Sequence, residues 1–119
     1  MPRLVITCLA PDAPEHKTTD VADDYSHVTI PLGASVMASF QVQVADQVIP
    51  VDMPLLRMPI TATDGRTAYA VVSISQGKGL ATWKPESSGR WQITEANINS
   101  ELPEEAHMLF GGIDVFVYN

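Results

Sequence analysis

Cysteine is almost absent from this chain, which limits both its chemistry and its expected location. The 119 residues include a single cysteine, Cys8, so no internal disulfide can form. A zinc site would want more histidine or cysteine than the sequence supplies. The first twelve residues lack the small-residue cleavage site of a signal peptide. We therefore expect a protein of the cytoplasm or of a virion that is not secreted by a signal peptide.

Long apolar runs are missing, and basic residues are few. No apolar run approaches the roughly 18 residues that a membrane helix needs, so we expect no membrane partner. The net charge is −7, and residues 92–119 hold five acids and no base. A phosphate backbone would be repelled by such ends, so we expect no nucleic-acid partner. The acids are interpreted mainly as a solvated surface that keeps the protein soluble.

Long helical stretches are also scarce, because nine prolines and seven glycines are spread along the chain. What is present is alternation of apolar and polar residues. The clearest case lies within residues 64–94, which predict an antiparallel meander of three strands joined by turns at 76–79 and 85–89. In its first strand one face carries Ala68, Ala70, Val72 and Ile74, and the other carries Tyr69, Val71 and Ser73.

Further short strands are predicted on both sides of this meander, at residues 3–9, 27–32, 36–44, 48–51 and 113–118. Residues 10–26 read as a long acidic loop or arm, and residues 53–60 as an extended crossover because of their two prolines. One short helix is expected near 95–102, capped by Thr94 and ended by Pro103. The sequence thus predicts one mainly β domain over 1–119, an antiparallel β-sandwich or jelly-roll-like barrel of about eight short strands.

Motifs for metal binding and catalysis are weak. The acidic loop holds several oxygen ligands and two histidines, but their spacing lacks the regular alternation and sharp glycine of an EF-hand; they are Asp12, Glu15, His16, Asp20, Asp23, Asp24 and His27. The serines at 87 and 88 do not fit the G-x-S-x-G nucleophile pattern. The segment 76–79 resembles a hairpin turn more than a phosphate-binding loop. We expect no enzyme activity, no metal and no cofactor.

Two tryptophans are the most informative aromatic residues. Trp83 and Trp91 flank the loop 84–90 and are expected across from each other on paired strands. They fit a core pair, an interface with a protein partner, or a platform for a small ligand. As an interface they would act together with Lys84 and Arg90, whose side chains can donate hydrogen bonds.

These observations favour a non-catalytic structural or assembly protein that acts through protein–protein contacts. Virion decoration and tail-accessory proteins are the analogy at the level of the fold. Its partner would be a protein, either copies of itself in a homo-oligomer or a larger assembly. Two alternatives stay open: a monomeric acidic binder or inhibitor of a protein, and a carbohydrate-binding module that uses the two tryptophans.

Overall fold

The computed structural model describes residues 1–13 and 18–119. It is mainly β, with 57% strand and 8% helix, as the sequence predicts. The strands of this part are β1 (Arg3–Asp12), β2 (Asp20–Val21), β3 (His27–Pro31), β4 (Ser35–Val44), β5 (Gln47–Val48), β6 (Met53–Ala62), β7 (Thr67–Ser75), β8 (Lys78–Trp83), β9 (Gly89–Ile93) and β10 (Ile113–Tyr118). The helices are α1 (Glu95–Ser100) and the 3-10 turn η1 (Glu104–Ala106).

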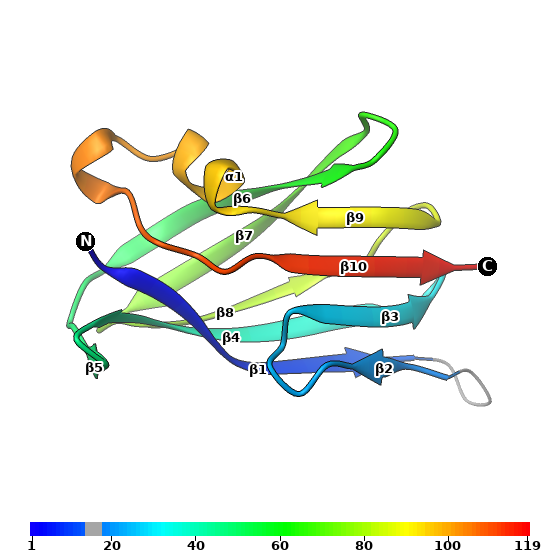
Figure 1. Ribbon diagram of the computed structural model, residues 1–119, viewed down its shortest axis with the longest axis horizontal. Helices are drawn as coiled ribbons and strands as arrows, with labels where there is room; N and C mark the ends of the chain where they lie inside the picture. Colours follow the sequence, from blue (N-terminus) through cyan, green and yellow to red (C-terminus); the bar gives the residue numbers. More distant parts are fainter. Residues whose placement is uncertain (14–17) are drawn as a thin grey trace.

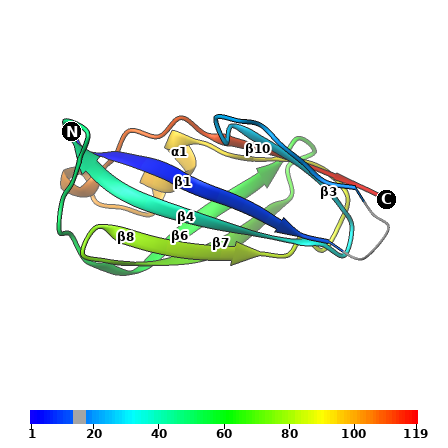
Figure 2. The ribbon, with the colours of Figure 1, turned by 90° about the horizontal axis from the view of Figure 1, so that it is seen from below.

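The strands form one nearly closed, barrel-like sheet with two opposed layers (Figures 1 and 2). The strand order is β1-β4-β8-β7-β6-β9-β10-β3-β2, with β5 beside β4. Pairing of β6 with β9 joins the layers along one side. On the other side the start of β1 meets the segment before β10, where the Leu4 N–H donates to the Leu109 carbonyl (2.8 Å) and the Leu109 N–H donates to the Pro2 carbonyl (2.9 Å). The layers therefore enclose a single apolar core.

Alternate residues of the strands point into this core, as the sequence predicts. In β7, Ala70, Val72 and Ile74 are buried, whereas Tyr69, Val71 and Ser73 are exposed. The predicted helix is present but shorter, and Thr94 caps it by accepting a hydrogen bond from the Asn97 N–H (3.1 Å). No helix in the described ranges is long and apolar enough to cross a membrane.

Three expected segments differ from the structure. The strand predicted over 48–51 is only the short β5, Gln47–Val48, and the chain from Ile49 to Asp52 is not strand. Residues 53–60 belong to strand β6 although they contain Pro54 and Pro59. Pro54 lies where the pairing of β6 with β7 is irregular. Pro59 pairs with Tyr69 of β7 on one side. Its other side has no partner strand, because β9 pairs with β6 only at Thr61 and Ala62. A proline can stand at such an edge because its missing N–H removes no ladder hydrogen bond there.

The predicted loop over 10–26 also contains strand residues, although residues 22–26 are turn and irregular chain as expected. Ala10–Asp12 continue β1, where they pair with residues 35–37 of β4, and Asp20–Val21 form β2 against β3. Main-chain pairing thus extends into a segment whose side chains carry no strand pattern. Its candidate metal ligands Glu15 and His16 lie outside the described residues.

The turn between β7 and β8 confirms the predicted reversal at 76–79. Gln76 and Gly77 both have positive φ, 54° and 78°, which a two-residue hairpin turn requires. A Cβ atom on Gly77 would lie 2.0 Å from the Ile49 carbonyl oxygen, so only glycine fits. The turn packs against the chain that follows β5.

We expect Gly77→Ala to lower the free energy of unfolding by more than about 2 kcal/mol, because positive φ costs a residue with a Cβ about 1–2 kcal/mol and the contact with Ile49 adds to it. Gly65→Ala is the matched control, since Gly65 has φ 96° but nothing within 4 Å of its Cβ position. It should lose about 1–2 kcal/mol in the same urea titration. Equal losses would show that the turn moves away from Ile49 at no cost.

Candidate functional site

Trp83 and Trp91 meet inside the barrel. Trp83 ends β8 in one layer, and Trp91 lies in β9 of the other. Both side chains are buried, with relative solvent exposures of 9% for Trp83 and 4% for Trp91. Their ring centroids are 5.5 Å apart in an edge-to-face arrangement. The two rings form the core pair that was one of the three sequence interpretations.

The meander expected over 64–94 is therefore wrong in its last strand. β8 already has β4 on one edge and β7 on the other, so no edge is left for β9. Instead the chain after Trp83 crosses to the opposite layer, and β9 pairs with β6 and β10. The tryptophans face each other across the core and not along a ladder.

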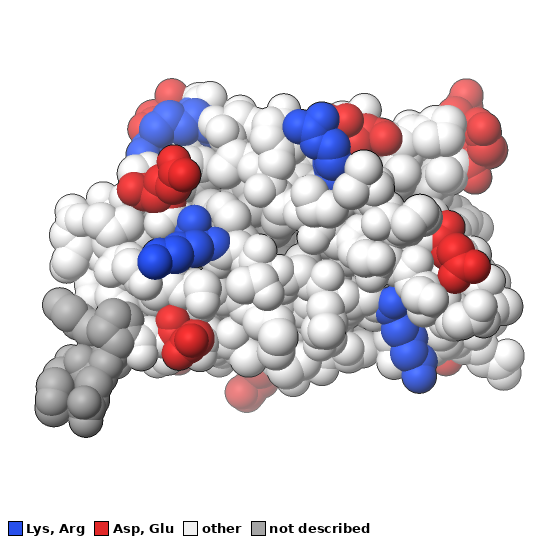
Figure 3. All heavy atoms as spheres, turned by 180° about the vertical axis from the view of Figure 1, so that it is seen from behind, with Lys and Arg blue, Asp and Glu red and all other residues white. Residues whose placement is uncertain are grey.

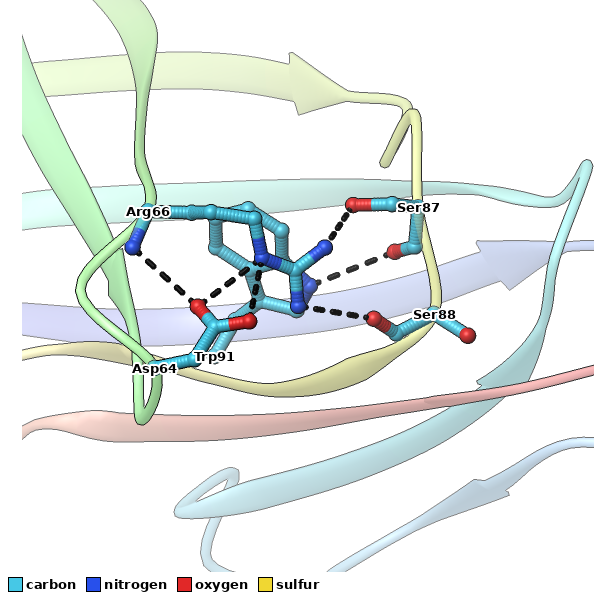
Figure 4. Close-up of polar contacts among 5 residues, drawn as sticks. All are labelled: Asp64, Arg66, Ser87, Ser88 and Trp91. Atoms are coloured by element: carbon cyan, nitrogen blue, oxygen red, sulfur yellow. Dashed lines mark hydrogen bonds and ion pairs between the residues drawn. The ribbon is translucent and has the colours of Figure 1, made fainter.

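Arg66 organises the crossing, although no pattern in the sequence marks it as a site residue (Figure 4). Its guanidinium lies 5.0 Å from the centre of the Trp91 ring and donates to Asp64 (2.9 Å), to the Ser87 hydroxyl and to the Ser88 carbonyl (3.1 Å). The Trp91 indole N–H donates to the Ser87 carbonyl (3.3 Å). One side chain thus holds the β6–β7 turn, the crossing loop and the buried tryptophan together.

Asp64 is the carboxylate of this cluster. The hydrogen bond from the Arg66 side chain, followed by the one from the Arg66 backbone N–H, lowers the pKa of Asp64 below its usual value. The Asp-Gly-Arg sequence signals a turn, but its partners lie 21 and 22 residues away, so only the tertiary structure shows the cluster.

The four residues predicted for an interface do not form one surface. Trp83, Trp91 and the exposed Lys84 line a hollow of about 510 Å³, together with Arg66 and Tyr69. Arg90 instead points outward from β9 and pairs with Asp114 of β10 (3.3 Å). Their interface role stays a prediction, but burial leaves the two indoles little ring surface for direct contact.

A second feature is the surface formed by β4, β8, β7 and β6. These four strands contain no aspartate or glutamate, although the chain has fourteen acids. Seen from this side, the middle of the molecule is a broad area without charged side chains (Figure 3). We name this surface the acid-free face and define it by its outward residues Met37, Arg57, Tyr69, Val71, Lys78 and Leu80.

The acid-free face combines apolar and basic groups. Leu80 is 56% exposed and Val71 50%, both high values for large apolar side chains on regular strands. The Arg57 guanidinium lies 4.3 Å from the centre of the Tyr69 ring. Beside Leu80 and Lys78 the face is hollowed by about 520 Å³ over small side chains such as Ser39. Such a mixed surface suits contact with another macromolecule.

Acidic residues gather elsewhere, in the segment 101–105 between α1 and β10. Glu101, Glu104 and Glu105 are exposed, and none forms an ion pair in the described part of the chain. Their neighbour Glu95 differs, because it accepts a hydrogen bond from the Phe110 N–H (2.8 Å). We refer to residues 101–105 as the acidic segment.

The acidic residues around β2 show no metal-binding geometry. Within residues 1–13 and 18–119, no three histidine, cysteine or carboxylate side chains are grouped to hold a metal ion. Asp24 accepts hydrogen bonds from the Ser26 hydroxyl (2.6 Å) and the Ser26 N–H (3.0 Å), and these lower the pKa of its carboxyl group. This carboxylate caps a local turn.

Comparison with known proteins gives no relative for this chain: no family model matches it, and neither a curated protein nor a solved structure shows significant similarity.

We expect Arg66→Ala to lower the free energy of unfolding by about 1–2 kcal/mol, because it removes several partly exposed hydrogen bonds and the contact with Trp91. The pKa of Asp64 should rise toward its ordinary value when measured by NMR titration. The pKa of Asp64 is lower in the folded protein than in the unfolded chain. Ionised Asp64 therefore stabilises the fold at pH values above its pKa in the unfolded chain, and this stabilisation is lost as the pH falls through its pKa in the folded protein.

Lys84→Ala is the control for this experiment, because Lys84 lines the same hollow but makes no hydrogen bond or ion pair among the described residues. It should leave both the stability and the pKa of Asp64 unchanged. An unaltered Asp64 pKa in Arg66→Ala would contradict the assigned contact.

Proposed function

We propose that this protein is a non-catalytic assembly module that associates with copies of itself through the acid-free face. The observation that supports it is the exposure of Leu80, Val71 and Met37 on strands without a single carboxylate, in a chain of net charge −7. Soluble chains usually scatter charge over regular strands of this kind. A surface kept free of acids and rich in apolar groups is characteristic of the centre of a protein interface.

The strand registers place these apolar groups next to small or flexible neighbours. Leu80 lies opposite Ser39 on one side and Ser73 on the other, and Val71 lies opposite Arg57. Short hydroxyl side chains let a partner approach the backbone closely. Tyr69 and Arg57, stacked beside them, are residue types that contribute strongly to binding when they are covered.

Of the residues predicted for the interface, Lys84 fits this proposal directly, since it is exposed at the end of β8. Trp83 lies in the core beneath β8, and Trp91 packs against it from the opposite layer. Arg90 lies in the opposite layer and is engaged with Asp114. Because both indoles are buried, stacking on a sugar is not proposed.

We expect light scattering after size-exclusion chromatography to detect an oligomer at low salt whose mass falls on dilution. Leu80→Lys should weaken association about 10- to 100-fold, because it places a charge where an apolar side chain would be buried. The fold should survive this change, since the side chain is exposed.

Phe116→Lys is the matched control. Phe116 is 48% exposed on β10, in the opposite layer, so the same kind of substitution there should leave the mass unchanged. A wild-type chain that remains monomeric at every concentration would overturn the proposal, as would a Leu80→Lys variant that assembles normally.

A further inference from the structure

We infer that the contact is head to tail, with the acidic segment of one copy docked on the acid-free face of the next. This inference rests on the self-association proposed above and names the surface that covers the face. The chain itself carries both complementary surfaces, one with exposed cations and apolar groups, the other with exposed carboxylates. Charge complementarity favours this pairing over contact between two identical faces.

The cations of the acid-free face are available to a partner. Arg57 and Lys78 of the face are exposed, as is Lys84 directly after β8, and none of them belongs to either of the two ion pairs among the described residues. Face-to-face pairing would bring two such cationic sets together and repel. Carboxylates brought to the same place would be attracted to each of them.

The acidic segment is held in a defined shape. The Asn99 side chain donates to the Met108 carbonyl and accepts from the Met108 N–H, both at 2.9 Å, which ties together the two ends of the chain around the segment. The His107 ring adds a contact with the Leu102 carbonyl (3.1 Å). A segment that is already ordered loses little conformational entropy when it docks.

The segment also offers an apolar group among its charges. Pro103 is exposed between Glu101 and Glu104, and Leu102 is half-buried beside it. Pro103 can contact the apolar residues of the face while the carboxylates meet its cations, and Leu102 anchors the segment on the protein's own core. The acidic segment thus contains both an apolar group for the apolar residues of the acid-free face and carboxylates for its basic residues.

The two surfaces lie on different parts of the molecule. The acidic segment projects near the end that holds the N-terminus, whereas the acid-free face is a flank formed by four strands (Figures 1 and 2). A contact between unlike surfaces leaves one of each unused in every dimer. Association of this kind continues into a closed ring or an open filament.

A charge exchange tests the inference. The face variant is Arg57→Glu with Lys78→Glu, and the segment variant is Glu104→Lys with Glu105→Lys. Each variant alone should associate at least about 100-fold more weakly than the wild type, because like charges then meet at the contact. An equimolar mixture should associate again, because each contact between a face variant and a segment variant joins opposite charges.

The control for the segment variant is Asp20→Lys with Asp23→Lys, which raises the net charge by the same amount on exposed acids near β2. It should assemble as the wild type does. Raising the salt concentration should weaken the wild-type assembly, because exposed charges hold part of it.

The outcomes separate the inference from the proposal beneath it. If Leu80→Lys disrupts the oligomer but the segment variant assembles normally, the face acts in assembly and the head-to-tail contact is wrong. If both charge variants are monomeric and their mixture stays monomeric, the inferred pairing is also wrong. A monomeric wild type would overturn the self-association and the inference together.

Discussion

The contact between Trp83 and Trp91 is the interaction on which the two layers of this barrel depend. The rings join the end of β8 in one layer to the middle of β9 in the other, with centroids 5.5 Å apart. Large aromatic side chains bury more surface than other residues, so this pair spans the space between the layers near the crossing loop. Arg66 then covers Trp91 and binds the loop, which keeps the chain from taking another path.

Once these layers are fixed, the alternation of residues along each strand determines which side chains are exposed on the surface. Every apolar side chain that points into the core has a neighbour that points out, and in β4, β6, β7 and β8 none of these neighbours is an acid. The negative charge is carried by loops and by the remaining strands. The fold thereby leaves an apolar and basic flank free of acids, and no charged residue is buried in the described part of the chain.

Local features of the sequence predicted much of the fold. The alternation in β7, the positive φ at Gln76 and Gly77, and the cap at Thr94 each depend on residues within one short stretch. The partner of β9 could not be predicted in this way, because it depends on whether both edges of β8 are already occupied. Arg66 was missed for the same reason, since its partners become neighbours only after the chain has crossed between layers.

The candidate surface was less predictable than the fold, because exposure depends on the arrangement of whole strands. The sequence marked Trp83 and Trp91 by their residue type, yet type alone does not decide which face of a strand is covered. The alternation in β7 already separates Val71 from Val72, but Leu80 looks like an ordinary core residue until β8 is placed beside β7 with its inward position filled by Ala81. A barrel has one interior, so the apolar residues on the opposite side of the same strands stay exposed in the monomer. The proposed contact with the acidic segment of another copy would bury them.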